Sequence, residues 1–276
     1  FLLPEEVAHG DHGEGVCTRC EKTVTIGRVE KMSKSKKNVI DPNILLNKYG
    51  ADTTRLFCLF AAPPERDLEW SEQGVEGGFR FLNRVWRFAA KHMTTIRDAA
   101  PYTGGLDTLS GDVRDLYRKT HETIQRVTRD IEDRFHFNTA ISAVMELVNT
   151  LYSADKSSST PEWPGVARFA IESAVVLLAP IVPHFSEEIW AEMGHDESIL
   201  MAPWPEYRED ALERDDLLIV IQVNGKVRSR FTIAGNAADE TIKEKALSDE
   251  RALKFVNQKP IKKVIVVKKK LVNIVV

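Results

Sequence analysis

The segment KMSKSKKN, residues 31–38, holds four lysines and two serines around a single apolar methionine. A run of like charges is typical of a solvated surface loop or of a basic patch that contacts nucleic acid. The alternation of ammonium and hydroxyl groups also fits a movable loop that binds the phosphates of a ligand. The choice between these interpretations depends on the elements that surround the segment.

A second cluster of reactive side chains precedes the lysines, where His9, His12, Cys17 and Cys20 form the pattern H-x2-H-x4-C-x2-C. These residue types could hold a tetrahedral zinc ion. Because a single CxxC is a weak signal and the histidine spacing is unusual, we favour the interpretation without zinc and leave the role of these residues open. The chain has no P-loop, no HExxH pattern and no serine in a nucleophile elbow.

The composition of the 276 residues, 43% hydrophobic and 29% charged, is that of a globular protein with about two domains. Three cysteines are too few for a disulfide framework, which favours a cytoplasmic location. No apolar run approaches the roughly 20 residues of a membrane span, so we expect no membrane partner. The opening FLLPEEV is not a signal peptide, and because residue 1 is phenylalanine we expect a piece of a longer protein.

The charge is distributed unevenly, although the net charge of the chain is only −3. Residues 1–214 carry 25 basic and 34 acidic side chains, a net of −9, whereas residues 215–276 carry 13 and 7, a net of +6. No acidic residue follows Glu250. This asymmetry favours a polyanion as the partner of the C-terminal part. The alternative is a basic face that only keeps a small domain in solution.

The residues after the lysine segment predict two short helices. Asp41 can cap the first helix, Pro42 suits its first position and Gly50 can end it. The second helix begins near Asp52, and the prolines of AAPPE at 61–65 end it.

Between residues 75 and 154 the apolar residues recur with a helical period. Three stripes are visible, one with Leu82, Val85, Trp86 and Ala89, one with Ile124, Val127 and Ile131, and one with Ile141, Val144, Met145, Val148, Leu151 and Tyr152. Asn138 is the expected cap of the third helix. A polar break at 153–165 and two further helices, at 166–179 and in PHFSEEIWAEM, complete a predicted antiparallel helix bundle.

The C-terminal part predicts a small α+β domain. Two extended runs flank Asn224-Gly225, a pair that suits a type I′ hairpin turn. Alternation in the second run directs Val227, Phe231 and Ile233 to a core, and Arg228, Arg230 and Thr232 outward. Helices at 239–247 and 249–256 and strands in IKKVIVV and LVNIVV follow, after an acidic linker at 205–216.

The lysine segment carries a family resemblance. Residues 31–35, KMSKS, are identical to the signature of class I aminoacyl-tRNA synthetases. From about residue 26 to the C-terminus the chain resembles bacterial leucyl-tRNA synthetases, most specifically in KKNVIDPNILLNKYGADTTRLF and in VIQVNGKVRSRFTI. The related enzymes for isoleucine and valine differ after GAD and lack this C-terminal domain.

The resemblance implies a mainly α fold built around an antiparallel helix bundle of the anticodon-binding-domain type. Residues 1–70 would end the catalytic region and hold the KMSKS loop and the stem-contact segment. The bundle would occupy 71–204, the linker 205–216 and the small α+β tRNA-binding domain 217–276.

The resemblance also implies an activity, the ligation of leucine to tRNA(Leu) with ATP and Mg²⁺. When pyrophosphate leaves, negative charge builds on it, and a lysine on a movable loop can bind that charge more tightly than it binds ground-state ATP. Lys34 and Lys31 would be the catalytic phosphate contacts. The implied ATP-binding residues are Lys31, Met32, Ser33, Lys34 and Ser35, with the two serines holding the shape of the loop.

The tRNA-binding candidates form two groups. The candidates on the bundle are Arg80, Arg84 and Arg87, with plain surface arginines beside a core Trp86 as the alternative. In the C-terminal domain, contacts with backbone phosphates are expected from Lys226, Arg228, Arg230, Lys262 and Lys263.

The nucleotide-binding half of the family, with its His-Ile-Gly-His signature, and the editing domain are absent from this sequence. We therefore expect an enzyme in the whole protein and no activity in this piece alone. The alternative is a free-standing, non-catalytic RNA-binding module.

Overall fold

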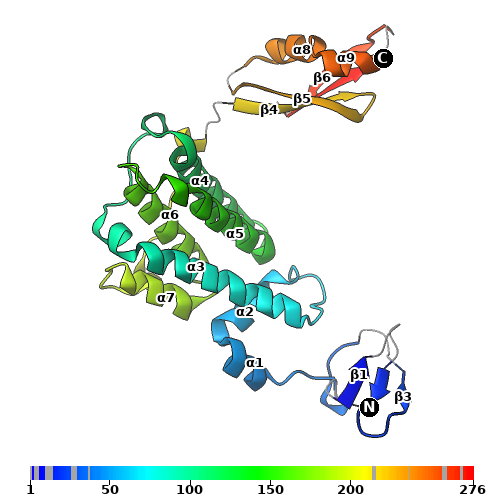
Figure 1. The fold of residues 1–276 in the computed structure, drawn as a ribbon, viewed down its shortest axis with the longest axis vertical. Helices are drawn as coiled ribbons and strands as arrows, with labels where there is room; N and C mark the ends of the chain where they lie inside the picture. Colours follow the sequence, from blue (N-terminus) through cyan, green and yellow to red (C-terminus); the bar gives the residue numbers. More distant parts are fainter. Residues whose placement is uncertain are drawn as a thin grey trace. The chain divides into compact units, whose positions relative to one another are not determined.

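The computed structural model is mainly helical and contains two small sheets (Figure 1). It describes residues 2, 6–9, 15–25, 30–36, 38–212, 216–235, 237–256, 260–267 and 270–276. The chain forms two compact units, Phe1–Tyr207 and Arg208–Val276. The mainly α class is therefore confirmed, whereas the finer boundaries at 70, 204 and 216 remain predictions.

The first unit begins with a small antiparallel sheet in the order β1-β2-β3. Its strands are β1 (Val7–His9), β2 (Gly15–Cys17) and β3 (Thr23–Val24). Val7 pairs with Cys17, and Gly15 pairs with Val24. The lysine segment follows this sheet and contains one turn of 3₁₀ helix, Lys34–Lys36.

The two short helices lie where the sequence predicts them. In α1 (Pro42–Tyr49) the Asp41 carboxylate accepts a hydrogen bond from the Asn43 backbone N–H at 2.9 Å. Gly50 ends α1 with a φ of 82° and begins the link to α2 (Ala51–Phe60). That positive φ is a conformation that glycine adopts without strain.

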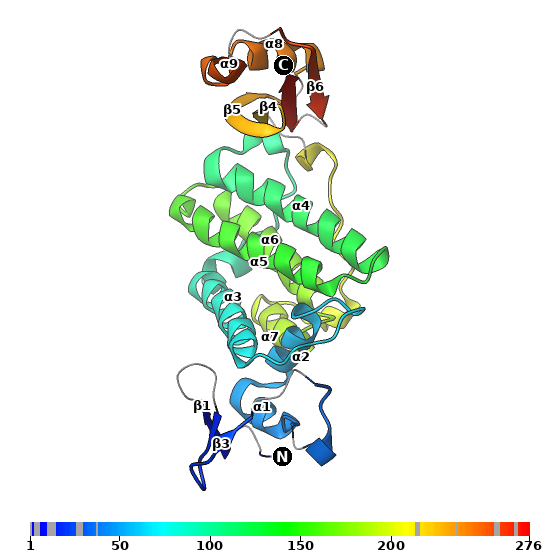
Figure 2. The same ribbon diagram turned by 90° about the vertical axis from the view of Figure 1, so that its right-hand side faces the viewer.

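The helices of the first unit that follow α2 build its bundle (Figure 2). They are α3 (Glu72–Asp98), α4 (Gly111–Glu132), α5 (Phe137–Ala154), α6 (Trp163–Leu178) and α7 (Pro183–Glu192). Short 3₁₀ turns lie at Leu106–Thr108, Asp155–Ser157, Ile199–Met201 and Asp210–Leu212.

Helix α6 lies at the centre and packs against α3, α4, α5 and α7. Val166, Ile171 and Val176 point in three different directions around its axis, yet each is buried. A helix that is apolar on all sides is a core helix, which fits the high proportion of alanine, valine and leucine in α6.

Two details of the predicted bundle are wrong. Asn138 does not cap α5, because the helix already begins at Phe137 with His136 at the cap position. The first turn of α5 is instead bound by Asp130 of α4, whose carboxylate accepts a hydrogen bond from the Thr139 hydroxyl at 2.6 Å. Trp86 is not a core residue, since 38% of it is exposed at the edge of the buried stripe of α3.

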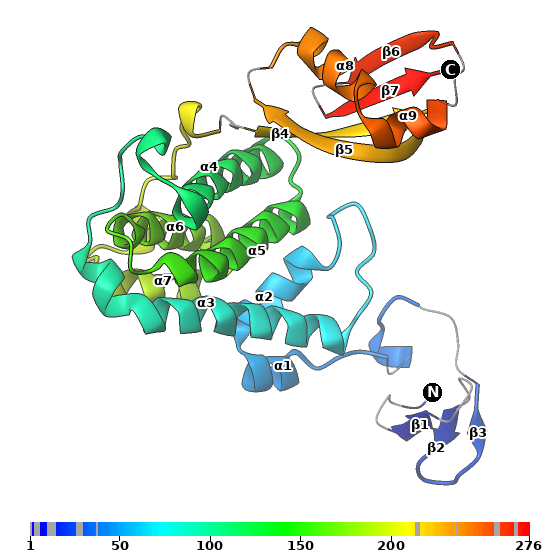
Figure 3. The same cartoon turned by 45° about the horizontal axis from the view of Figure 1, so that its top comes forward.

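The second unit is a four-stranded sheet with two helices packed on one face (Figure 3). Its elements are β4 (Asp216–Val223), β5 (Lys226–Ala234), α8 (Asp239–Leu247), α9 (Glu250–Val256), β6 (Lys263–Val267) and β7 (Leu271–Val275). The strand order is β5-β4-β7-β6, with β4 and β7 parallel. Ile219, Ile242 and Ile274 are fully buried between the sheet and the helices.

The hairpin turn is confirmed, but one part of the predicted alternation is wrong. Asn224 and Gly225 both have positive φ, 49° and 79°, as a type I′ turn requires. The pairs Ile221–Ser229 and Gln222–Val227 leave Arg228 without a partner in β4, which is a β-bulge. Ser229, Phe231 and Ile233 keep the inward phase, whereas Val227, beyond the bulge, is exposed.

No helix among the described residues is long and apolar enough to cross a membrane.

Candidate functional site

The lysine loop is shaped by hydrogen bonds among its short polar side chains. The hydroxyl oxygens of Ser33 and Ser35 lie 2.9 Å apart. The Ser33 backbone N–H donates to the Asn38 amide oxygen at 2.7 Å, and the Asn38 amide nitrogen donates to the Lys31 carbonyl at 3.3 Å. These contacts fix the backbone of the loop without using a lysine ammonium group.

Asn38 is the residue of this loop that sequence reasoning missed. Its side-chain amide, at the end of the loop, bonds to the backbone of Ser33 and of Lys31 near the start. Asparagine commonly bonds to nearby backbone in turns, so its position directly after a run of lysines was the available signal.

The lysines of the loop differ in whether they are paired. The Lys36 ammonium forms an ion pair with Glu30. Lys31 and Lys34 are exposed, and neither ammonium has an ion-pair partner within the described part of the chain. The structure therefore presents two cations that are available to a ligand.

A cavity of about 660 Å³ lies beside the loop. Lys31, Met32 and Asn38 line one side, and residues 67–70 line the other. The ring of Trp70 is held edge-on against Phe57 at 5.2 Å, so this wall is anchored in the first helices. Glu30 also lines the cavity, so with Asp67 and Glu69 its lining holds three carboxylates against the single ammonium of Lys31.

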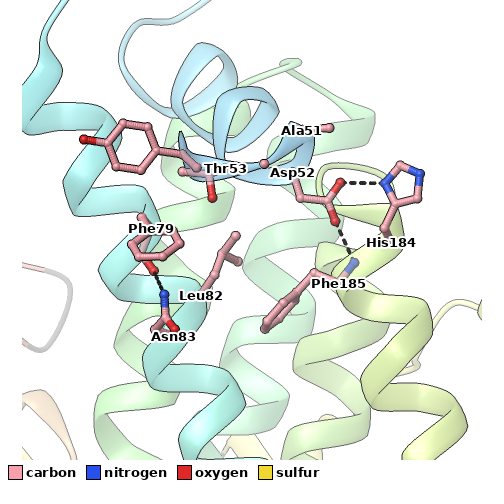
Figure 4. A pocket seen from close by; sticks show the side chains of 10 residues that line it. Ala51, Asp52, Thr53, Phe79, Leu82, Asn83, His184 and Phe185 are labelled. Atoms are coloured by element: carbon pink, nitrogen blue, oxygen red, sulfur yellow. Dashed lines mark hydrogen bonds and ion pairs between the residues drawn. The ribbon is translucent and has the colours of Figure 1, made fainter. Parts of the chain in front are cut away.

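Helix α2 joins the loop region to the bundle through two charged side chains. The Asp52 carboxylate accepts a hydrogen bond from the Phe185 backbone N–H at 2.6 Å and lies 3.0 Å from His184 Nδ1 (Figure 4). Arg55 donates to the carbonyls of Pro180 and Ile181 at 3.0 and 2.9 Å.

The charges of this joint match the helix ends that they contact. An acid lies at the N-terminus of α7, where backbone N–H groups have no partner within the helix, and an arginine binds the carbonyls that follow α6. We call Asp52, Arg55 and residues 180–185 the α2 joint. It orients α2, the second helix after the lysine loop, relative to the bundle.

A second cavity, of about 510 Å³, lies next to the α2 joint, and Figure 4 shows its walls. They are largely aromatic and aliphatic, with Tyr49, Phe79, Leu82 and Phe185 among them. The amide of Asn83 is already bonded to the Phe79 carbonyl at 2.9 Å. Asp52 and His184 also line this cavity, but the Asp52 carboxylate is engaged at the N-terminus of α7 by the Phe185 backbone N–H.

The arginines predicted to contact tRNA on α3 are not equivalent. Arg84 lies over the Tyr152 ring at 5.0 Å and is half-buried. Arg80 is exposed and lies 3.7 Å from Glu76, and Arg87 donates from Nε to the Asn83 carbonyl at 3.2 Å. Their contact with tRNA stays a prediction, for which the exposed Arg80 and Arg87 are better placed.

The basic candidates of the second unit lie on the two outer strands of its sheet and next to them. Lys226 and Arg230 are exposed on β5, while Lys262 and Lys263 are exposed at the start of β6. Arg228 was predicted to point outward, but the bulge turns it over the Phe255 ring of α9 at 3.9 Å. Contact of these residues with tRNA remains a prediction.

The cysteine–histidine pattern is only partly visible in the structure. His12 and the side chain of His9 lie outside the described residues. Among the side chains that are described, no three of His, Cys, Asp or Glu come together as a metal site. Cys17, Cys20 and Cys58 are free thiols.

Comparison with known families matches two parts of the chain. Residues 20–71 match the model of class I tRNA synthetases (I, L, M and V). Residues 113–244 match the anticodon-binding domain of tRNA ligases, a match that runs from α4 into α8. The chain is thus a class I tRNA synthetase sequence that contains an anticodon-binding domain.

The similar proteins define the family more narrowly. The chain is 58% identical over all of its 276 residues to a leucine–tRNA ligase of Desulfatibacillum aliphaticivorans, and 56% identical to that of Desulforapulum autotrophicum. In each case it spans 32% of the relative's length. It belongs to the leucine–tRNA ligase family and corresponds to about a third of such a protein.

A solved structure supports the same assignment. The chain resembles the LeuRS of Agrobacterium radiobacter K84, solved in a ternary complex with tRNA and LeuAMS. The TM-score is 0.77 at 31% sequence identity, covering 89% of this chain and 31% of that one.

Proposed function

We propose that this chain is the C-terminal part of a leucine–tRNA ligase, which activates leucine with ATP and transfers it to tRNA(Leu) in the cytoplasm. The observation that carries the proposal is a KMSKS loop whose Lys31 and Lys34 are exposed and have no ion-pair partner among the described residues. The chain that holds this loop is similar to leucine–tRNA ligases over its whole length. The remaining two thirds of such a protein would supply leucine selection and adenosine binding.

The proposed role of the loop is to stabilise the pyrophosphate that leaves when leucyl-adenylate forms. Lys34 and Lys31 would contact its phosphates, and Met32, Ser33 and Ser35 would complete the ATP-binding loop. Such cations accelerate a reaction when they bind the developing charge more tightly than the ground state. Mg²⁺ would arrive with ATP, since the described residues form no metal-ligating group of three.

The proposed role of the helices and of the second unit is to bind tRNA. Helices α3–α7 would form the antiparallel bundle of the anticodon-type domain, with Arg80 and Arg87 toward the RNA. Lys226, Arg230, Lys262 and Lys263 would bind backbone phosphates from the second unit. The solved relative was captured with tRNA, which supports this assignment.

The test is leucine-dependent exchange of pyrophosphate with ATP, followed by charging of tRNA(Leu), by the whole protein that contains this chain. Leucine should support both reactions, whereas isoleucine, valine and methionine should not. The 276-residue chain alone should support neither reaction. If the whole protein binds tRNA but gives no exchange with any of these amino acids, it is an RNA-binding module and the ligase assignment is wrong.

A further inference from the structure

The cysteines that the proposed function leaves unused form the turn between β2 and β3. The turn Cys17-Thr18-Arg19-Cys20 is closed by two backbone hydrogen bonds of Cys17, whose N–H donates to the Lys22 carbonyl at 3.0 Å and whose carbonyl accepts from Glu21 at 2.9 Å. Glu21 leaves the turn with a φ of 55°, which is uncommon for a residue with a side chain. This tight turn brings the two thiols together.

The turn surrounds the Cys17 sulfur with hydrogen-bond donors. The backbone N–H groups of Arg19 and Cys20, together with the Cys20 side chain, hydrogen-bond to the Cys17 thiol. Amide donors directed at a sulfur stabilise the thiolate, which is the form that binds metals. The hydrogen bond between the Cys17 and Cys20 side chains places the two sulfurs next to each other.

The sheet that carries this turn has almost no hydrophobic core. Its strands contain three, three and two residues. Cys17 is the only buried apolar residue that the structure describes before Leu45. The remaining support is polar, for example the 2.6 Å ion pair between Arg19 and Glu6. Structures this small usually need a disulfide or a metal ion for stability.

We propose that Cys17 and Cys20 provide two thiolate ligands of a structural Zn²⁺ site that stabilises the β1–β3 sheet. Zinc suits a pair of thiolates and takes two further nitrogen, sulfur or oxygen donors in a tetrahedral site. The sequence places His9 and His12 just before the cysteines, but the proposal concerns only the two thiolates. A Cys17–Cys20 disulfide would consume both sulfurs, so a chain with this disulfide could not bind zinc through these residues.

The proposal does not depend on the ligase activity, and its test measures metal binding directly. The 276-residue chain is purified in reducing buffer, and its zinc content is determined by native mass spectrometry and elemental analysis. We expect about one zinc ion per chain. Cys17→Ser and Cys20→Ser should each lose most of it, whereas Cys58→Ser, which changes the exposed thiol of α2, should keep it.

Cobalt and hydrogen exchange give two further measurements. Co²⁺ added to the metal-free chain should give a thiolate-to-cobalt charge-transfer band in the wild type and in Cys58→Ser, but not in Cys17→Ser. Zinc should also slow amide exchange in residues 15–24 while leaving the bundle helices unchanged. Because α3–α7 have their own core, circular dichroism will show whether the serine variants are folded.

Three results would overturn the proposal. The first is a wild-type chain that binds no zinc at micromolar concentration. The second is retention of zinc by both serine variants, and the third is loss of zinc in Cys58→Ser to the same extent as in Cys17→Ser.

Discussion

The lysine loop and the α2 joint use charged side chains in opposite ways. In the loop, Lys31 and Lys34 are exposed, and no described acidic group pairs with them. In the joint, Asp52 is only 12% exposed, and both Asp52 and Arg55 bind backbone groups of the 180–185 corner. The two regions are separated along the chain only by α1 and the residues next to it.

The difference separates function from folding. A cation that has no partner in the protein contributes little to stability, because water solvates it equally well in the unfolded chain. Removal of such a cation should therefore change only the interaction with the ligand, and not the stability of the fold. A charge that binds helix ends is part of the folded structure, and its removal takes a hydrogen-bond partner from those backbone groups. Substitutions in the two regions should thus have different readouts.

The largest expected effect is that of Lys34→Ala in the whole protein. Removal of one preorganised contact with developing charge typically lowers a rate by about 10²–10³. We expect leucine-dependent pyrophosphate exchange to fall by this factor, while leucine binding and the unfolding midpoint stay close to wild type. An exchange rate within threefold of wild type, about 0.6 kcal/mol, would remove Lys34 from the phosphate-binding role.

Lys36→Ala is the matched control for the unpaired lysines. Lys36 belongs to the same turn, but its ammonium is paired with Glu30. Its removal should slow exchange much less than Lys34→Ala does. Equal losses in the two variants would mean that the positive charge of the loop acts collectively and that pairing is irrelevant.

A second effect is expected from deletion of residues 208–276, the whole second unit. The exposed lysines and arginines of this unit, like Lys31 and Lys34 of the lysine loop, have phosphate groups as their proposed partners. Four phosphate contacts, from Lys226, Arg230, Lys262 and Lys263, would contribute about 3 to the slope of log affinity against log salt. The truncated chain should bind tRNA(Leu) about tenfold or more weakly at low salt, with a slope flatter by that amount.

Filter binding or anisotropy at several salt concentrations measures this prediction. The double variant Lys262→Gln and Lys263→Gln, which keeps the unit, should give about half of the change in slope. Binding that is unchanged by the deletion would show that the basic residues only keep the unit in solution.

The parts of the fold that were predictable from sequence depend on local interactions. Asp41, Pro42 and Gly50 act within one helix, and Asn224-Gly225 sets its own turn. Their signals are contained in a few neighbouring residues, so they are visible without any tertiary information. The KMSKS loop was found for the same reason, because its residues are contiguous.

The parts that could not be predicted depend on distant contacts. Arg55 binds carbonyls more than 120 residues away, and nothing near it in the sequence indicates that partner. The bulge at Arg228 depends on how β5 pairs with β4, so strict alternation gave the wrong side for Val227 and for Arg228. The sequence alone did not favour a zinc site at the turn Cys17-Thr18-Arg19-Cys20. The argument for that site depends on the backbone donors around the Cys17 sulfur, which only the structure shows.

Arg55→Ala tests the other side of the comparison. It removes two hydrogen bonds from a charged donor to the carbonyls of Pro180 and Ile181. We expect the free energy of unfolding to fall by about 1.5–3 kcal/mol, measured by urea denaturation. Arg55→Lys should recover only part of the loss, because an ammonium is a point charge and lacks the planar fork of arginine.

Arg66→Ala is the control for the loss of an arginine, since Arg66 is exposed in the loop after α2. It should change the unfolding free energy by no more than about 0.5 kcal/mol. A stable Arg55→Ala protein would show that the α2 joint is held by apolar packing alone.

The smallest expected effect concerns His92, a buried group that is neither available to a ligand nor used at a helix end. Its side chain is 11% exposed and packs against the rings of Trp163 and Phe88 at 4.7 and 4.9 Å. Burial lowers the pKa of His92 below its ordinary value of 6.5, and Lys91 adds to this, while Asp155 opposes it. As the pH falls through 6.5, His92 therefore binds a proton in the unfolded chain but stays neutral in the folded chain. The free energy of unfolding decreases until the pH reaches the pKa of His92 in the folded chain. Urea midpoints at about pH 7.5 and 5.5 should show a larger acid loss in the wild type than in His92→Gln. An equal acid loss in His92→Gln would mean that the Asp155 carboxylate compensates for burial and that this histidine does not couple folding to pH.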